Sequence, residues 1–374
     1  MAEKISVLML GGSGTLSKTI ACKACRLGFA VSVLNRGNNN TALPESITKI
    51  KANFYDADEI IRSVDGLKFD IVIDFLSRRK SDIERVFPVF ANRCKQYIFI
   101  SSCCVFRRSQ EDFPIVETSP KPNIDWKYNV EKCEAEQSLI QLSNKLSLCN
   151  YTIIRPYITY DEHRIPIAVA PNYAYHQTLI ERIKHGKPMF VIDDGQTVST
   201  VTFVEDFANG VLGLLDNPKA YNEDFNVVGD FQYTHKEILE TLYRKLGMTP
   251  NIQMIPRNKI AEQLPNYSEM VLGDRALDAK FDNAKLKSAV PGIHFEYDLD
   301  KGLDRVLEFY KNRSDDLIDY QYEGQIDRLI GKVSGVKSVF CKYNNKNGVL
   351  IYLLFNLFSF KVAARLKNYL RFLL

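Results

Sequence analysis

Two residues with complementary chemistry, Tyr128 and Lys132, stand four positions apart in the stretch Tyr-Asn-Val-Glu-Lys. On a helix such a pair lies on one face, one turn apart. A lysine ammonium beside a phenol stabilises the phenolate. A phenol tuned in this way can take a proton from an alcohol, or return one to a carbonyl, while a cofactor carries the hydride. Surface helices also contain such pairs by chance, so the interpretation depends on the elements that position them.

A glycine-rich stretch near the N-terminus is the first of these elements. Residues 5–10 are a short apolar run, which predicts a buried parallel strand, and a Gly-x-x-Gly-x-x-Ser sequence follows before a helix that runs to about Gly28. Glycines permit a tight turn and let the backbone approach a pyrophosphate at the helix N-terminus. Ser17 stands where a third glycine is usual. The expected dinucleotide contacts here are Gly11, Gly12, Gly14, Thr15 and Leu16.

The end of the second predicted strand bears on the choice of dinucleotide. Residues 30–34 form this strand, and Asn35-Arg36-Gly37 follows it. An NAD site usually carries an acidic residue here, about twenty residues past the glycines, for the ribose hydroxyls. No acid is present, and an arginine can pair with a 2′-phosphate. Asn35 and Arg36 are therefore candidate cofactor residues, and NADP is favoured over NAD, with solvent exposure or stacking on adenine as the alternatives for Arg36.

Further strand ends supply the remaining candidate residues. Runs at 47–54, 70–75, 96–102 and 151–156 predict the third to sixth strands. Parallel strands bind ligands at their carboxyl ends. Ser102 lies at such an end, where its hydroxyl either orients a substrate oxygen beside Tyr128 or caps the following turn. The other cofactor contacts expected at strand ends are Asn53, Phe54, Phe75, Leu76, Ser101 and Pro156.

The alternation of strands and helices predicts an α/β fold, namely a Rossmann-type doubly wound parallel sheet. The pattern becomes less regular after the sixth strand, where helices at 170–185, 205–215 and 234–246 (with Thr234 as N-cap) and short strands at 189–192, 198–204 and 224–228 are expected. We expect three parts: an NAD(P)-binding domain at 1–165, an interleaved substrate lobe at 166–330, and a tail at 331–374.

Composition and cysteine usage are those of an ordinary globular protein, with 45% hydrophobic and 25% charged residues. The eight cysteines are scattered, without paired metal-ligand spacing, and we expect no metal. Residues 1–4 lead directly into the first strand without a signal-peptide pattern. These features predict a cytoplasmic protein, since reducing compartments favour free thiols.

The C-terminal tail differs from the rest of the chain in charge. It carries eight Lys and Arg residues from Lys332 onward and no Asp or Glu, so the remainder carries −4 within a whole-chain charge of +4. Residues 349–360 form an apolar run of about a dozen, shorter than the roughly 20 residues of a membrane-spanning helix. Apolar residues with only positive charge favour an amphipathic helix on an anionic membrane surface. The alternative is a helix packed on the body or on a partner in a homodimer, and no nucleic acid is expected.

Taken in order, several motifs resemble those of the extended short-chain dehydrogenase/reductases, in their NAD-dependent epimerase/dehydratase branch. They extend from about Ile5 to about Tyr310 and include Gly-Gly-Ser-Gly-Thr-Leu, Ile-Ser-Ser-Cys-Cys-Val-Phe, Tyr-Asn-Val-Glu-Lys, Ile-Ile-Arg-Pro and Phe-Val-Glu-Asp-Phe-Ala. The resemblance implies a Rossmann domain, bound NAD(P) and a catalytic centre of Ser102, Tyr128 and Lys132, in which the lysine also holds the nicotinamide ribose. It further implies an epimerase or reductase acting on a nucleotide sugar, as in surface polysaccharide biosynthesis.

Two departures from that family pattern keep other functions open. The stretch before Phe-Val-Glu-Asp, residues 198–202, lacks the arginine that grips a pyrophosphate in sugar-nucleotide epimerases, and Phe106-Arg107 replaces the usual Tyr-Gly. Candidate replacements for anion binding are Arg107, Arg164 and Arg275. The alternatives are a reductase of a small non-nucleotide carbonyl and a non-enzymatic NAD(P)- or RNA-binding protein on the same scaffold.

Overall fold

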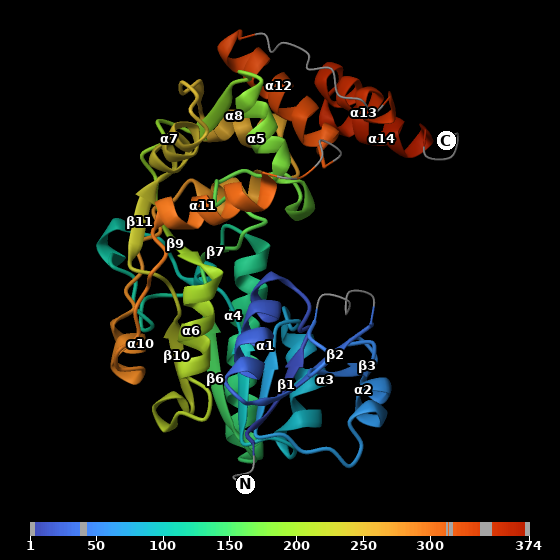
Figure 1. Ribbon diagram of the computed structural model, residues 1–374, viewed down its shortest axis with the longest axis vertical. Coiled ribbons are helices and arrows are strands. Elements are labelled where there is room, and N and C mark those ends of the chain that lie inside the picture. Colours follow the sequence, from blue (N-terminus) through green and yellow to red (C-terminus); the bar gives the residue numbers. More distant parts are fainter. Residues whose placement is uncertain (1–3, 38–42, 312, 314–316, 337–345, 371–374) are drawn as a thin grey trace. The chain divides into compact units, whose positions relative to one another are not determined.

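The computed structural model describes residues 4–37, 43–311, 313, 317–336 and 346–370 (Figure 1). The chain divides into two compact units. Unit 1 comprises residues 1–159, 200–230 and 280–297, and unit 2 comprises residues 160–199, 231–279 and 298–374. Two of the boundaries between the units, at 159/160 and 199/200, fall within the strands β7 (Ile158–Tyr160) and β9 (Val198–Phe203). The division into domains expected from the sequence stays a prediction.

Unit 1 is built on a seven-stranded sheet with the order β10-β6-β5-β4-β1-β2-β3, and every neighbouring pair is parallel. Both faces of β1 are covered, because its alternating residues Val7, Leu8, Met9 and Leu10 are all fully buried. This arrangement confirms a Rossmann-like α/β fold. The strands are β1 (Ser6–Leu10), β2 (Ala30–Asn35), β3 (Thr48–Lys51), β4 (Ile71–Asp74), β5 (Gln96–Ile100), β6 (Asn150–Arg155) and β10 (Glu223–Asn226).

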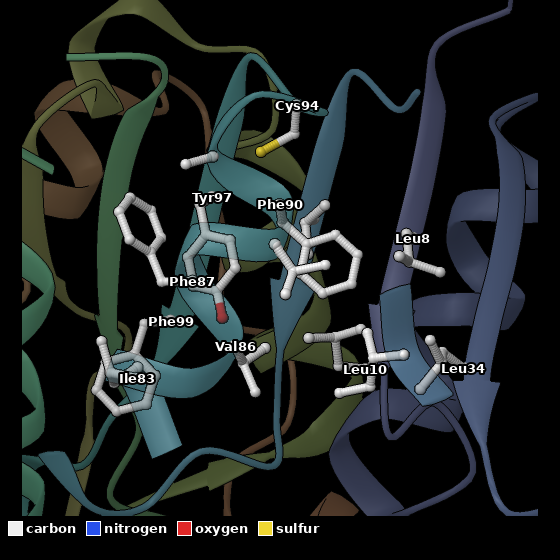
Figure 2. Packing of buried hydrophobic residues seen from close by; sticks show 14 of the residues in the cluster. Leu8, Leu10, Leu34, Ile83, Val86, Phe87, Phe90, Cys94, Tyr97 and Phe99 are labelled. Atoms are coloured by element: carbon white, nitrogen blue, oxygen red, sulfur yellow. The ribbon is translucent and has the colours of Figure 1, made fainter. Parts of the chain in front are cut away.

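Helices cover this sheet, and α3 contributes most to the apolar cluster shown in Figure 2. Ile83, Val86, Phe87 and Phe90 from α3 meet Leu8, Leu10, Leu34, Tyr97 and Phe99 from the strands. The α3 positions follow the three- and four-residue spacing of one helical face. The helices of unit 1 are α1 (Thr15–Arg26), α2 (Ala57–Ser63), α3 (Lys80–Ala91), α4 (Lys127–Leu146), α6 (Val204–Gly213) and α10 (Ala284–Ala289).

Unit 2 contains a two-stranded sheet, in which β12 pairs in parallel with β8, and most of the C-terminal helices. A three-stranded sheet of order β11-β9-β7 includes the two strands in which the chain crosses between the units. Among the described residues, no helix is both long and apolar enough to cross a bilayer. Its elements are α5 (Gln177–Lys184), β8 (Met189–Ile192), β11 (Phe231–Thr234), α7 (His235–Lys245), β12 (Ile252–Ile255), α8 (Arg257–Gln263), α9 (Ser268–Met270), a π-helical turn (Val271–Arg275), α11 (Leu299–Tyr310), α12 (Tyr320–Ser334), α13 (Lys346–Leu357) and α14 (Phe360–Leu370).

Most predicted elements are present, with two shorter than expected. The third strand covers only Thr48–Lys51 of the expected 47–54. The expected helix at 170–185 begins only at Gln177, because Asn172 caps a separate 3₁₀ turn at Tyr173–Tyr175. The predicted N-cap at Thr234 is confirmed, since its side chain accepts a hydrogen bond from the Glu237 N–H at 3.1 Å.

Crowding in the glycine turn yields a stability prediction. A Cβ at Gly12 would overlap the methyl groups of Val33, whereas a Cβ at Gly14 would find its nearest neighbour, Ser17 Oγ, at 3.5 Å. We predict that Gly12→Ala lowers the free energy of unfolding by about 1–3 kcal/mol, as overpacking does. Gly14→Ala is the matched control and should cost less than about 1 kcal/mol. Urea unfolding measures both; equal losses would contradict the prediction.

Candidate active site

The turn between β1 and α1 has the geometry of a phosphate-binding turn. Gly11 adopts a φ of +89°, which L side chains rarely adopt, and a Cβ there would lie 2.6 Å from Leu76 Cδ2. The Gly11 N–H donates to Leu34 O at 2.9 Å. Ser17 Oγ donates to Gly11 O at 2.7 Å and accepts from the Gly14 N–H at 3.0 Å. The serine in place of the third glycine therefore ties the turn to the first turn of the helix.

The N-terminus of α1 is suited to an anion. Its N-cap, Gly14, has no side chain, and the first turn contains no acidic residue. Thr15 and Leu16 begin the helix, so its first N–H groups and the positive end of its dipole face the turn. A turn that excludes a Cβ followed by such a helix start fits the pyrophosphate of a dinucleotide.

The ends of β2 and β3 hold the residues expected near the adenosine. Asn35 Oδ1 accepts a hydrogen bond from the Gly37 N–H at 2.7 Å, and Arg36 is exposed. Asn53 Oδ1 accepts from the Tyr55 N–H at 3.2 Å. Phe54 is buried in the core cluster, so its side chain stabilises the fold. Contacts from these residues to a cofactor stay predictions.

Asp74 at the end of β4 organises the turn that carries Phe75 and Leu76, and the sequence analysis missed it. Its Oδ1 accepts from the N–H groups of Leu76 at 2.8 Å and Ser77 at 2.9 Å, and its Oδ2 accepts from Tyr97 OH at 2.7 Å. The carboxylate is fully buried. The available signal was an acid at the end of an otherwise apolar strand. Ser77 Oγ is buried and makes no hydrogen bond within the described part of the chain, as expected of a group that a ligand would satisfy.

Lys132 joins α4 to the ends of two central strands. Its Nζ donates to Ser77 O, after β4, and to Ile100 O, at the end of β5, both at 2.8 Å. The side chain is buried, and this burial lowers the pKa of Lys132 to about 8, against the opposing effect of the Asp74 and Glu136 carboxylates. Lys132 therefore lies at the carboxyl edge of the sheet.

Tyr128 lies one turn before Lys132, and α4 begins just ahead of it at Lys127. Its ring centroid is 4.8 Å from that of Trp126, and the Arg78 guanidinium lies 5.1 Å from it over the ring. Arg78 in turn forms an ion pair with Glu131 at 2.7 Å. Tyr128 is half-buried. Tyr128 and Lys132 both lie on α4, one turn apart, as the sequence predicts.

The two serines after β5 have different partners. Ser102 Oγ accepts from the Cys104 N–H at 3.2 Å, which is the turn-capping alternative considered for it. The bond uses the oxygen as an acceptor and does not use the hydroxyl proton. Ser101 Oγ donates to Glu136 Oε1 at 2.5 Å. Pro156 O accepts from the Cys103 N–H at 2.9 Å and ties the end of β6 to the same turn.

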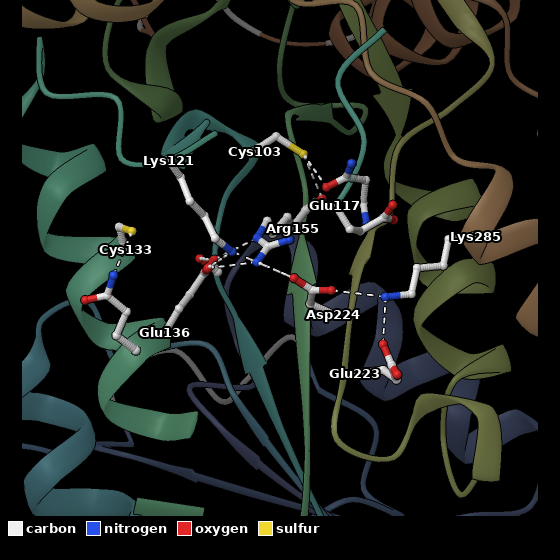
Figure 3. A network of polar contacts seen from close by, with 12 residues as sticks. Cys103, Glu117, Lys121, Cys133, Glu136, Arg155, Glu223, Asp224 and Lys285 are labelled. Carbon is white, nitrogen blue, oxygen red and sulfur yellow. Dashed lines mark hydrogen bonds and ion pairs between the residues drawn. The ribbon is translucent and has the colours of Figure 1, made fainter. Parts of the chain in front are cut away.

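The Glu136 carboxylate that binds Ser101 belongs to a buried ionic network with Arg155, Lys121 and Asp224 (Figure 3). Glu136 accepts two hydrogen bonds from Arg155, each at 2.8 Å, and Arg155 also donates to Asp224 Oδ2 at 2.7 Å. Lys121 Nζ lies 3.1 Å from Glu136 Oε2. These contacts hold the pKa of the Glu136 carboxyl below its usual range, against the opposing effect of burial. Sequence reasoning missed Glu136 because its partners are distant along the chain.

The three arginines considered for anion binding occupy different settings. Arg107 is exposed and pairs with Asp112 at 3.1 Å. Arg164 and Arg275 both belong to unit 2. Burial lowers the pKa of Arg164, and the positive charge of Arg275 lowers it further. Arg275 also has an acidic partner, since its Nη1 lies 3.4 Å from Asp274 Oδ2.

One group of side chains in unit 2 has the spacing of metal ligands. Asp161, Glu162 and His163 each offer one ligand atom, and these atoms lie within 4.8 Å of one another. The Asp161 carboxylate already accepts from Tyr173 OH at 3.0 Å and lies 3.1 Å from His163 Nδ1. These contacts account for the cluster without an ion.

Comparison with known proteins agrees with this geometry. A model of the NAD dependent epimerase/dehydratase family matches residues 7–228, which is more than half of the chain. The chain belongs to this family. The NAD-dependent epimerase/dehydratase proteins are extended short-chain dehydrogenase/reductases, so the resemblance noted from the motifs is confirmed. The Gly11–Leu16 turn, Asp74 and Lys132 all lie inside the matched region.

The chain is similar to two curated relatives and one solved structure whose names indicate different functions. The chloroplast stem-loop binding protein of 41 kDa b of Arabidopsis thaliana is 26% identical over 79% of this chain and 77% of its own. The 2′-dehydrokanamycin reductase of Streptomyces kanamyceticus is 21% identical over 90% and 93%. The dTDP-glucose 4,6-dehydratase of Bacillus anthracis, solved in complex with NAD, shares the fold with a TM-score of 0.66 at 14% identity, covering 83% of this chain and 97% of that one.

The pKa of Lys132 leads to a prediction about cofactor binding. The ammonium is protonated below about pH 8 and neutral above it. Hydrogen bonds from a charged donor are the stronger ones, so we predict that the affinity for NAD⁺ falls several-fold as pH rises through about 8. Isothermal titration across this range measures the change. Lys132→Met is the control and should bind more weakly with no step near pH 8; a step of the same size in the variant would contradict the assignment.

Proposed function

We propose that this family member is an NAD(P)-dependent enzyme that transfers a hydride at a hydroxyl or carbonyl carbon of a nucleotide-linked sugar. The observation that carries the proposal is the buried Lys132, one helical turn from Tyr128 and bonded to Ser77 O and Ile100 O at the carboxyl edge of the sheet. Ligands of parallel α/β sheets bind at that edge. The bound dinucleotide supplies the hydride acceptor or donor.

Each residue of the centre has a distinct role in this proposal. Tyr128 takes the proton of the substrate hydroxyl when the carbon is oxidised, and returns it when a carbonyl is reduced. Lys132 stabilises the phenolate form of Tyr128. An ammonium has three N–H donors, and Ser77 O and Ile100 O take two of them. The third donor is assigned to the ribose next to the nicotinamide. Ser102 donates its hydroxyl proton to the reacting oxygen while its oxygen accepts from the Cys104 N–H.

The proposed substrate class rests on membership of the family and on the solved relative named dTDP-glucose 4,6-dehydratase, whose name gives a nucleotide sugar as its substrate. A second candidate is the reduction of a sugar-like carbonyl without a nucleotide. The residues before Phe203 supply no arginine, and the relative named 2′-dehydrokanamycin reductase supports this candidate.

A non-enzymatic function is the third candidate. The relative named a chloroplast stem-loop binding protein keeps it open. A binding protein has no requirement for a buried lysine beside a tyrosine at the nucleotide edge, and both Tyr128 and Lys132 are present here. We therefore favour a catalytic function, because it gives Tyr128 and Lys132 a role.

The substrate has to be identified before the mechanism is tested. Thermal shifts with UDP-, GDP-, CDP- and dTDP-sugars identify the ligand, and turnover of that ligand is then measured by NAD(P)H absorbance or product analysis.

Removal of the Tyr128 hydroxyl then tests the mechanism. We predict that Tyr128→Phe lowers kcat by at least about 100-fold, the scale of general acid–base catalysis, and leaves dinucleotide binding unchanged. Tyr151→Phe is the control and should keep full activity, because Tyr151 lies near the amino end of β6, whereas the site lies at the carboxyl ends of the strands. Full turnover by the Tyr128→Phe protein would refute the mechanism. Stabilisation by a small carbonyl compound alone would favour the second candidate.

We propose a preference for NADP because no acidic residue follows β2, and replacement of Arg36 tests this preference. Its side chain is exposed directly after β2, and an arginine at this position can pair with a 2′-phosphate. We predict that Arg36→Ala weakens NADPH binding about 10- to 100-fold, as loss of a charge-assisted hydrogen bond would, and leaves NADH binding unchanged. Fluorescence titration with both cofactors gives the two dissociation constants. If the wild-type protein copurifies with tightly bound NAD⁺ that is released on denaturation, the preference for NADP would be overturned and an epimerase-like cycle would be indicated.

A further inference from the structure

The outer face of α13 is apolar and uncovered. Leu350, Leu353 and Leu357 are 39%, 40% and 63% exposed, and their spacing of three and four residues places them on one side of the helix. The opposite side is packed, since Phe355 is buried in a cluster with α14, and Leu354, at the edge of the exposed side, belongs to the same cluster. This helix therefore has two apolar faces, and only one of them has a partner within the described part of the chain.

The next helix also has an exposed apolar side. Val362, Leu366 and Tyr369 of α14 are 43%, 36% and 69% exposed and again recur at four and three residues. Phe358, between the helices, is 43% exposed, and Ala363 on the inner side of α14 is fully buried. We call the seven exposed side chains the tail stripe: Leu350, Leu353, Leu357, Phe358, Val362, Leu366 and Tyr369.

Positive charge without any acid accompanies the tail stripe. Lys361 and Arg365 are exposed on α14, and the sequence from 332 to the end contains no Asp or Glu to pair with them. Some exposed cations elsewhere in unit 2 have acidic partners, as Arg244 has in Asp300 at 2.6 Å and Lys259 has in Glu262 at 3.0 Å. Lys367 differs from its neighbours because it donates to Gln321 at 2.9 Å.

We propose that the tail stripe docks on the surface of an anionic phospholipid bilayer, with its apolar side chains among the acyl chains and Lys361 and Arg365 at the headgroups. Charge complementarity favours an anionic bilayer as the partner, because an anionic surface attracts a segment whose only charged side chains are cations. A second copy of the chain is disfavoured. A two-fold interface would set this patch against itself and bring four like charges together with no acid of the tail to offset them. The proposal does not depend on the reaction catalysed.

Co-sedimentation of the full-length protein with vesicles tests the proposal. We expect strong binding to phosphatidylcholine vesicles that contain phosphatidylglycerol, weak binding to phosphatidylcholine alone, and release by added salt. Leu357→Gln/Leu366→Gln should lower the partition coefficient about tenfold or more. Lys361→Glu/Arg365→Glu should lower it at least about 25-fold, since each cation near an anionic surface contributes about fivefold.

Matched controls separate the tail stripe from general surface effects. Met254→Gln/Leu272→Gln removes two side chains of unit 2 that are 58% and 41% exposed and lie outside the tail. Lys301→Glu/Arg305→Glu makes the same change of charge at two exposed positions elsewhere in unit 2. Both should bind as wild type, and all variants should keep the wild-type melting temperature, because the replaced side chains are exposed.

Several results would overturn the proposal. Equal binding to neutral and anionic vesicles would remove the role of charge, and wild-type binding by the tail variants would remove the role of the stripe. Sedimentation velocity without lipid that shows a dimer lost in Leu357→Gln/Leu366→Gln would assign the surface to a second copy. RNA binding lost on Lys361→Glu/Arg365→Glu, with no vesicle binding by wild type, would assign it to nucleic acid.

Discussion

The buried ammonium of Lys132 is the contact on which the candidate active site depends. It reaches the main-chain oxygens of Ser77 and Ile100, which follow neighbouring strands of the sheet, and so fixes α4 against both strand ends. A buried cation is costly unless polar groups surround it, and the two carbonyls meet that need. Because Tyr128 lies on the same helical face, the contact that stabilises the lysine also sets the depth at which the phenol stands.

The face of α4 that carries the proposed chemistry continues into the structural core of unit 1. Glu136 follows Lys132 by four residues, so the two share one side of the helix. Glu136 binds Ser101 and the guanidinium of Arg155, and it thereby secures the residue next to Ser102. Such a network is stable while every partner is present, since removing one leaves an uncompensated buried charge. The rigidity of the serine turn thus depends on charges that take no part in the proposed reaction.

Unit 2 contains a second buried ionic cluster, which binds the C-terminal helices. Arg182 of α5 contacts Glu323 at 2.8 Å and Asp327 at 2.6 Å on α12, and Lys187 pairs with the same two acids. Tyr352 of α13 donates to Asp327 at 2.9 Å. The family model ends at residue 228, so these helices are an addition to what it describes. Their inner faces are held by charge and packing, which leaves the tail stripe as an outer face.

The sequence by itself determined the local features: the Gly11–Ser17 turn, the buried strands and the Tyr128–Lys132 spacing. These follow from backbone freedom, hydrophobic periodicity and helical geometry, which act over a few residues. Only the tertiary structure decided the partners of Asp74, Glu136 and Arg155. Glu136 and Ser101 are 35 residues apart, and Arg155 and Asp224 are 69 residues apart. No local pattern shows whether such a charge will be buried or which group will meet it, because the fold of the whole chain brings the partners together.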